Sequence, residues 1–289
     1  MRKMSSIEIK NVTKQFGKKE VLAGLNFKLE PNKIYGLLGR NGAGKSTLLS
    51  IMTNRIPLTS GTVTVDGESI QNNDKILQKM YLMSEVSLYN SRLRVFQVFN
   101  ETDKMYGKFD FDLANRLAGE FGLDLNARIG KLSTGYRTIF KVLVAMGVSA
   151  EYIFLDEPTL GLDANHRDLF YKELMESYAN RPRTFVISTH LIEEVANLVE
   201  HVLIIKNGKI LIDSGVDETL AKAHTVTGPE ADVDSYTAGL NVIGHDSLGK
   251  IKANYVFGDM DDKILPDTVS IESMDLQKLF INLTNEGEN

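Results

Sequence analysis

The sequence contains no cysteine and no long apolar run. The lack of cysteine excludes a disulfide framework and any metal site built on thiolates, and it makes the cytosol the simplest location. The longest nearly apolar stretch, Val142 to Ala150, is far shorter than the roughly 20 residues of a transmembrane helix. Residues 1–8 hold no apolar segment of the kind that secretory signals carry, so we expect no such signal.

The composition is typical of a globular protein with a substantial core, since 43% of the residues are hydrophobic and 25% are charged. A length of 289 residues predicts one large domain and a small appendage. The net charge of −5 is uneven, because residues 217–289 carry fourteen acidic and five basic side chains, whereas residues 1–216 have a net charge of +4. An acidic segment repels phosphate, so we expect no nucleic-acid partner.

Hydrophobic periodicity predicts an α/β fold with a helical insertion. Strands are predicted at 7–12, 25–29, 34–38, 62–65, 152–155, 184–188 and 202–205, and helices at 164–178 and 191–199, while 93–148 is predicted to be helical. The alternation of strands and helices implies a largely parallel sheet with right-handed crossovers. Beyond Gly215 we expect helices at 216–223 and 270–283 and strands at 224–227, 240–243 and 250–257.

These patterns predict two domains. The first covers residues 1–216 and includes a helical subdomain at about 84–150. The second, residues 217–289, is a small accessory domain of mixed structure. Its acidic charge indicates a solvated surface, and we expect it to serve dimerisation or docking rather than the chemistry.

One glycine-rich segment identifies a ligand, because it matches the phosphate-binding pattern G-x-x-x-x-G-K-[ST]. The loop consists of Gly39, Arg40, Asn41, Gly42, Ala43, Gly44, Lys45, Ser46 and Thr47. An apolar run precedes it and residues with helical spacing follow it, which is the strand–loop–helix context that the motif requires. In such a loop, backbone N–H groups and the helix N-terminus bind phosphate, Lys45 faces the β- and γ-phosphates, and the Ser46 hydroxyl ligates Mg²⁺. We therefore expect the chain to bind a nucleoside triphosphate with Mg²⁺.

Two further strand ends supply candidate catalytic groups. The apolar run Tyr152–Leu155 leads into Asp156 and Glu157, and a carboxylate at the end of a parallel strand faces a ligand at the neighbouring loop. We expect Asp156 to hold Mg²⁺ and Glu157 to polarise the attacking water. His190 ends another strand, and we expect it to contact the γ-phosphate and to orient Glu157.

These motifs together resemble the ATPase subunit of an ABC transporter. The resemblance covers roughly residues 6–215 and includes Leu155-Asp156-Glu157-Pro158-Thr159 and a histidine 33 residues beyond Glu157. The signature loop of that family, usually LSGGQ, has its counterpart in Leu132-Ser133-Thr134-Gly135-Tyr136. The resemblance implies that Ser133 and Gly135 contact the ATP held by an opposite protomer, with threonine and tyrosine in place of the usual first glycine and glutamine.

The resemblance extends to other positions with less agreement. Phe16 lies where the family has an aromatic ring that stacks on adenine, and Asp163, in Gly161-Leu162-Asp163, follows the acidic pair. The family's glutamine, which links metal and water to the membrane partner, is replaced by Ser84, so either Ser84 or the adjacent Glu85 takes its place. The run Val86–Tyr89 either forms a groove for the membrane subunit or packs the helical insertion against the sheet.

The implied function is ATP hydrolysis that powers a membrane exporter, with ATP sandwiched between two cassettes. The implied partners are a transmembrane permease on a separate chain and a second ATPase subunit, identical or related, at the cytoplasmic face of the membrane. The layout is similar to bacterial exporters of antimicrobial or toxic peptides, of the bacitracin-resistance and phenol-soluble modulin types. The alternatives are a soluble ABC-type ATPase that acts on ribosomes or DNA, and a regulatory module that binds ATP without hydrolysing it.

Overall fold

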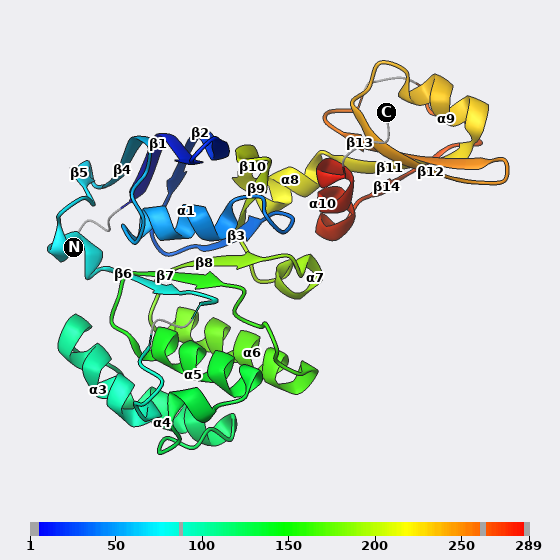
Figure 1. Cartoon of the computed structure of the whole chain (residues 1–289). Helices are drawn as coiled ribbons and strands as arrows, with labels where there is room; N and C mark the ends of the chain where they lie inside the picture. Colours follow the sequence, from blue (N-terminus) through cyan, green and yellow to red (C-terminus); the bar gives the residue numbers. More distant parts are fainter. Residues whose placement is uncertain (1–5, 87–88, 261–263, 286–289) are drawn as a thin grey trace.

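The computed structural model describes residues 6–86, 89–260 and 264–285, and Figure 1 shows their arrangement. Helix α1 (Lys45–Met52) lies between an antiparallel sheet and a larger central sheet. A group of helices covers the other face of the central sheet, and a third sheet extends from one end of the molecule. The α/β architecture predicted from the sequence is therefore confirmed.

The antiparallel sheet packs on one side of α1. Its strands follow the order β2-β1-β4-β5 and span Lys19–Leu29, Ile7–Phe16, Ser60–Val65 and Glu68–Ser69. A hairpin forms after Val65, where Asp66 and Gly67 have φ values of 51° and 84°. Two successive positive φ angles suit a tight turn between twisted strands, which explains the Asp-Gly pair.

The central sheet is parallel except at one edge. Its order is β10-β9-β3-β8-β7-β6, and these strands span Lys209–Gly215, His201–Lys206, Ile34–Leu38, Thr184–Thr189, Tyr152–Asp156 and Met80–Met83. Only β10, which pairs with β9, runs antiparallel to its neighbour among the strands of this sheet. The four inner strands were predicted from the sequence pattern, whereas the two edge strands, β6 and β10, were not.

Side chains alternate across the central sheet and supply two cores. Ile153 and Leu155 belong to the core under the helical group, whereas Tyr152 and Phe154 belong to the core around α1. This period of two is the geometry of a strand buried on both faces. The carboxyl ends of β3, β7 and β8 lie at one edge, because these strands are parallel and adjacent.

The predicted helical segment is confirmed. It contains α3 (Val95–Tyr106), α4 (Phe111–Glu120), a single 3₁₀ turn (Ile129–Lys131) and α5 (Thr134–Gly147), and it is preceded by the short α2 (Asp74–Leu77). Helices α5 and α6 (Ala164–Asn180) lie below the central sheet in Figure 1. The helix predicted at 191–199 is shorter, since α7 covers only Ile192–Val195.

The C-terminal part forms its own four-stranded antiparallel sheet. The strand order is β12-β13-β11-β14, with bounds Val242–Leu248, Ile251–Phe257, Ala223–Pro229 and Ser270–Ser273. Helix α8 (Val216–Ala221) leads into it, and α9 (Glu230–Thr237), which the sequence analysis missed, packs on it. The helix predicted at 270–283 is wrong at its start, because residues 270–273 pair with β11 and α10 begins only at Leu276 and ends at Thr284.

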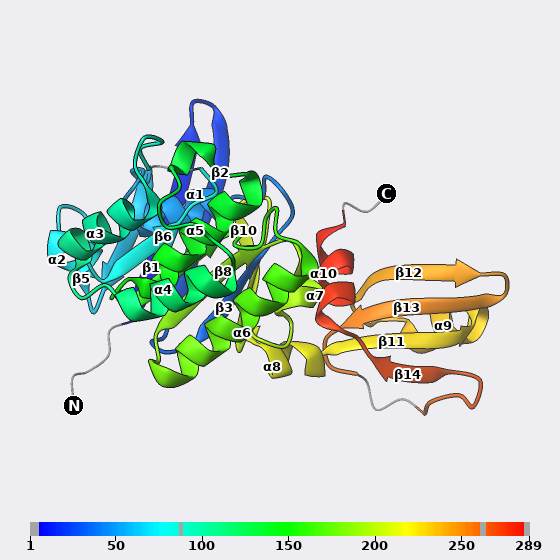
Figure 2. The same ribbon diagram turned by 90° about the horizontal axis from the view of Figure 1, so that it is seen from below.

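Helix α10 joins the C-terminal part to the large domain. It lies beside α7 in Figure 2, and its side chains Leu276, Leu279 and Phe280 are buried in the core that also contains Val195 and Val202. Lys206 reinforces the contact, because its Nζ donates to the backbone oxygens of Leu283 (3.1 Å) and Asn285 (2.9 Å). The boundary between residues 216 and 217 stays a prediction, and it coincides with the start of α8.

Candidate functional site

The glycine-rich loop connects the end of β3 to the start of α1, as the motif predicts. Gly44 caps α1 with a φ of 109°, a conformation that L side chains rarely adopt. A Cβ at this position would lie 2.7 Å from Leu22 Cδ2 and 3.1 Å from the Val21 backbone oxygen. Glycine is therefore required for the loop to turn into the helix beneath β2.

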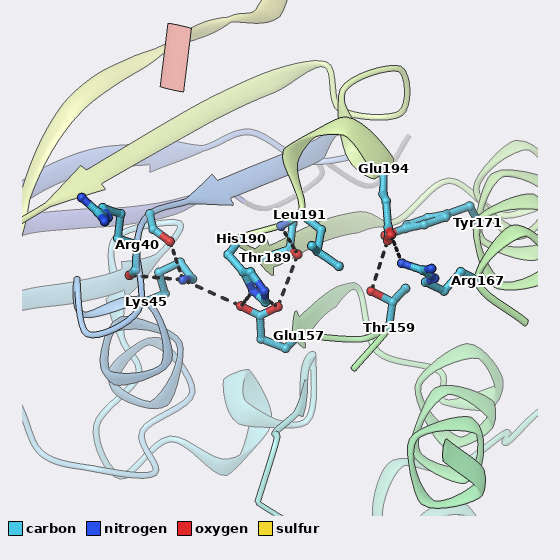
Figure 3. A network of polar contacts seen from close by, with 11 residues as sticks. Arg40, Lys45, Glu157, Thr159, Arg167, Tyr171, Thr189, His190, Leu191 and Glu194 are labelled. Carbon is cyan, nitrogen blue, oxygen red and sulfur yellow. Dashed lines mark hydrogen bonds and ion pairs between the residues drawn. The ribbon is translucent and has the colours of Figure 1, made fainter. Parts of the chain in front are cut away.

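Lys45 is buried within the loop that it follows. Its side chain is only 6% exposed, and Nζ donates to the backbone oxygen of Gly39 (2.6 Å) and lies 3.8 Å from Oε1 of Glu157 (Figure 3). Burial lowers the pKa of the Lys45 ammonium, and the carboxylates of Glu157 and Asp156 oppose that shift. The ammonium is thus held by acceptors at the mouth of a loop suited to anions.

Glu157 stands between the loop lysine and His190. Nδ1 of His190 is 3.1 Å from each oxygen of the Glu157 carboxylate, and the Thr189 hydroxyl donates to Oε2 over 3.3 Å (Figure 3). The Glu157 backbone has a φ of 49°, which is unusual for a residue with a Cβ and places its side chain at the strand end rather than across it. The ends of β7 and β8 and the first residue of α1 therefore meet at one carboxylate.

Asp156 is the buried member of the acidic pair. It is 4% exposed, and its Oδ1 has no hydrogen-bond partner within the part of the chain that the structure describes. Burial raises the pKa of this carboxyl group, whereas the nearby hydroxyls of Ser46 and Ser188 lower it. A buried carboxylate with an unused oxygen beside a serine hydroxyl is a donor set that fits Mg²⁺.

The described residues contain no group of three or more acidic or histidine side chains that could hold a metal by themselves. In proteins Mg²⁺ is usually bound through one or two carboxylates together with phosphate oxygens and waters. Asp156 and Ser46 are the residues that would hold it. Ser46 lines the cavity that opens at the loop, whereas Asp156 and Ser84 do not, and the predicted metal role of Ser84 stays a prediction.

A cavity of about 460 Å³ opens at the loop. It is lined by Arg40, Asn41, Gly42, Gly44, Lys45, Ser46, Thr47, Glu85, Glu157 and His190 from the predicted set, and by Lys19, Val21 and Leu160. The last three were missed. Lys19 and Val21 belong to β2, and their closeness in sequence to the predicted Phe16 was the one signal that could have found them. Gly39 and Ala43 form the loop without lining the cavity.

Besides Gly39, Ala43, Ser84 and Asp156, four more predicted residues do not line this cavity. Phe16 is 51% exposed, with the Lys14 ammonium 4.7 Å above its ring, and Asp163 caps α6 by accepting from the His166 backbone N–H. Ser133 caps α5 by accepting from the backbone N–H of Tyr136, and a Cβ on Gly135 would lie 2.8 Å from the Gly161 backbone oxygen. Within one protomer, the structure does not bring the signature loop to the phosphate loop. Their nucleotide contacts stay predictions.

A second cavity, of about 420 Å³, lies between β6 and the helical group. It is lined by Arg55, Tyr81, Leu82, Met83, Ser84, Val86, Tyr89, Asn90, Leu93, Val98, Glu101, Thr102, Met105, Tyr106 and Lys141. The hydroxyls of Tyr81 and Tyr89 are 2.6 Å apart, and Val86 is 69% exposed. Of the predicted groove Val86–Tyr89, the two ends line this cavity, and residues 87 and 88 lie outside the described residues.

A polar network ties the segment after His190 to the segment after Glu157. The Glu194 carboxylate accepts from the hydroxyls of Tyr171 (3.0 Å) and Thr159 (3.4 Å) and pairs with Arg167 (Figure 3). Thr138 of α5 also donates to the Leu160 backbone oxygen over 2.8 Å. The Glu194 contacts link the two strand-end segments, and the Thr138 contact links the segment after Glu157 to α5.

None of the helices in the described ranges combines the length and the hydropathy that crossing a bilayer requires. The sequence matches a family profile described as "ABC transporter" over residues 22–160. It is 30% identical over 215 residues to the lantibiotic transport ATP-binding protein SrtF of Streptococcus pyogenes, covering 73% of this chain and 91% of SrtF.

Other relatives carry different names. The ABC transporter ATP-binding protein YtrB of Bacillus subtilis (strain 168) is 27% identical over 212 residues, which is 73% of each chain. The ribose import ATP-binding protein RbsA of Oceanobacillus iheyensis is 26% identical over 227 residues, 74% of this chain. The chain spans only 45% of the length of RbsA.

The fold is shared with solved structures. One of them, titled "Structure of ATP binding subunit of ABC transporter", superposes with a TM-score of 0.67 at 20% sequence identity. The match covers 74% of this chain and 92% of the other.

Proposed function

The chain belongs to the ABC transporter family as an ATP-binding subunit, and from this we propose that it hydrolyses ATP to power a membrane exporter formed with a separate permease. The observation that supports hydrolysis most strongly is the position of Glu157, whose carboxylate lies 3.8 Å from the Lys45 ammonium and 3.1 Å from His190. A site that only binds ATP has no need for a carboxylate held in this way at a strained strand end.

The described residues support a mechanism in which this chain positions ATP and a water molecule. The loop N–H groups and Lys45 would bind the phosphates, and Asp156 and Ser46 would hold Mg²⁺. When bound, Mg²⁺ supplies charge neutralisation for the phosphate oxygens. Glu157 would accept the proton of the attacking water, and His190 would keep the Glu157 carboxylate in place through its Nδ1 contact.

We propose that a complete site requires two cassettes. Ser133 is exposed at the N-terminus of α5, where backbone N–H groups suit an anion, yet it does not line the cavity of its own protomer. Asp163 is likewise exposed at the start of α6 and does not line the cavity of its own protomer. A head-to-tail pair, of identical or related subunits, would let these residues contact the nucleotide bound by the partner.

The cavity between β6 and the helical group is the proposed docking site for the permease. Its lining includes the buried Tyr81 and the partly buried Tyr89, whose hydroxyl groups are 2.6 Å apart, and the exposed apolar side chains of Val86 and Met105. An amphipathic helix can place apolar side chains into such a groove and satisfy polar groups at its rim. This proposal places the chain at the cytoplasmic face of the membrane.

Export of amphipathic or toxic peptides is the finer part of the proposal, and the name of SrtF supports it. The name of RbsA, an import protein, supports the opposite direction. The phosphate loop and acidic pair serve either direction, because cargo selection belongs to the permease.

One experiment tests these proposals together. The tagged chain is recovered from native membranes in mild detergent, its partners are identified by mass spectrometry, and phosphate release is measured for the recovered complex. We expect a permease and ATP hydrolysis stimulated by amphipathic peptides. Recovery of ribosomes or DNA, or ATP binding without phosphate release, would favour the alternative functions instead.

A further inference from the structure

Lys141 belongs to none of the motifs discussed above, yet it is a lysine that is only 6% exposed, in the middle of α5. Its Nζ donates to the backbone oxygens of Ser84 (2.9 Å) and Glu85 (2.7 Å). A buried ammonium is costly unless its protons are bonded, so these contacts are a specific arrangement rather than a loose surface contact. Lys141 therefore attaches the segment after β6 to α5.

The segment that Lys141 contacts, residues 84–86, contributes lining residues to two cavities. Ser84 and Val86 line the cavity between β6 and the helical group, as Lys141 itself does. Glu85, between them in sequence, lines the nucleotide cavity with Lys45 and Glu157. A shift of this short segment would move the Glu85 carboxylate relative to the phosphate loop.

The charges around Lys141 fit this role. Burial lowers the pKa of the Lys141 ammonium, and the carboxylates of Glu85 and Asp156 oppose that shift, while Arg137 adds to it. The two carboxylates that favour the charged form of Lys141 are those associated with the nucleotide cavity and the proposed magnesium site. Lys141 thus interacts electrostatically with Glu85 and Asp156, and it also donates hydrogen bonds to the backbone oxygens of Ser84 and Glu85.

We propose that Lys141 is a positioning residue that holds the Ser84–Glu85 segment so that the Glu85 carboxylate faces the bound nucleotide. Lys141 acts through two backbone carbonyls, and Glu85 is the group that reaches the cavity. The catalytic consequence rests on the proposed ATPase function, whereas the positioning itself does not.

Amide hydrogen exchange tests the positioning without any nucleotide. Lys141→Met keeps most of the side chain's length and removes its hydrogen bonds, so amides of residues 84–86 should exchange at least about tenfold faster than in the wild type. Lys206→Met is the matched control, because Lys206 also donates to two backbone carbonyls, at the end of α10. It should leave residues 84–86 unchanged. Unaltered exchange of this segment in folded Lys141→Met would overturn the proposal.

Kinetics tests the consequence for hydrolysis. Lys141→Met should lower kcat about tenfold and change KM less than about threefold, and Lys141→Arg should restore most of the loss because its guanidinium can bond both carbonyls. If Lys141 acts through Glu85, the double variant with Glu85→Ala should be no slower than Glu85→Ala alone. If the loss of kcat in the double variant equals the product of the losses in the two single variants, Lys141 does not act through Glu85. A wild-type chain without ATPase activity would count against the proposed function, and the exchange measurement would still decide the positioning.

Discussion

Glu157 has three neighbours that matter for its chemistry: His190, Thr189 and Lys45. Glu157→Gln preserves the shape of the side chain but removes the proposed base, so ATP hydrolysis should fall by about two orders of magnitude or more while nucleotide binding persists. Phosphate release and titration with a fluorescent ATP analogue measure the two effects. Glu176→Gln, on the exposed face of α6, serves as a control that should keep full activity. Wild-type turnover in Glu157→Gln would remove Glu157 from the role of base.

The role proposed for Lys45 is in nucleotide binding rather than in catalysis. Lys45→Ala removes the ammonium proposed to face the phosphates, so the dissociation constant for ATP-Mg²⁺ should rise by about tenfold or more. Lys172→Ala, at an exposed ion pair on α6, should bind ATP normally. Because Lys45 also bonds the Gly39 carbonyl, circular dichroism should first establish that the variant is folded. Unchanged affinity in a folded Lys45→Ala chain would contradict the phosphate assignment.

At the scale of elements, the start of α5 offers a test of the two-cassette arrangement. A substitution at Gly135 is unsuitable, since a side chain there would collide with the Gly161 backbone. Ser133→Asp is better, because aspartate caps a helix as well as serine while adding a negative charge where the partner's phosphate is expected. ATP hydrolysis should fall about tenfold or more in Ser133→Asp, and the neutral cap Ser133→Asn should retain most activity.

Mixed dimers then decide whether Ser133 acts on the partner's nucleotide. Lys45→Ala protomers combined with Ser133→Asp protomers should form one doubly damaged site and one intact site, so part of the activity should return. This design assumes identical subunits. Absence of recovery in dimers proven to be mixed would indicate that Ser133 acts within its own protomer.

Much of the site could be predicted from the sequence, because a short segment of chain encodes each of its principal parts. Gly44, Lys45 and Ser46 are adjacent in sequence, and Asp156 and Glu157 end one strand. Lys141 could not be predicted, since its partners lie 56 and 57 residues away and are backbone oxygens that leave no trace in residue type.

The fold was predicted where periodicity was strong and missed where tertiary pairing decided the outcome. The inner strands β3, β7 and β8 each contain a short apolar run, which made them easy to recognise. Residues 270–273 were assigned to a helix, but their pairing with β11 makes them a strand. Pairing partners so distant in sequence cannot be inferred from local pattern.

At the scale of the whole molecule, the acidic C-terminal part shares a core with the cassette. Leu279 of α10 is fully buried in that core, so Leu279→Ala should lower the free energy of unfolding by about 2–5 kcal/mol. Ile281→Ala, 44% exposed on the same helix, should cost less than about 1 kcal/mol. Denaturant unfolding followed by circular dichroism and by ATP-analogue binding should show both signals lost together. Loss of α10 before ATP binding would mean that the two parts unfold independently.

The placement of α10 also sets an order of events during synthesis. The last cassette strand, β10, ends at Gly215, but the helix that closes its core ends only at Thr284. At about 5–20 residues per second, a ribosome needs roughly 4 to 14 s to make these about 70 residues. During that interval the core around Val195 and Val202 lacks the side chains of α10 that pack in it. A premature stop after β10 would leave a chain without α10, whose core residues Leu276, Leu279 and Phe280 would be missing.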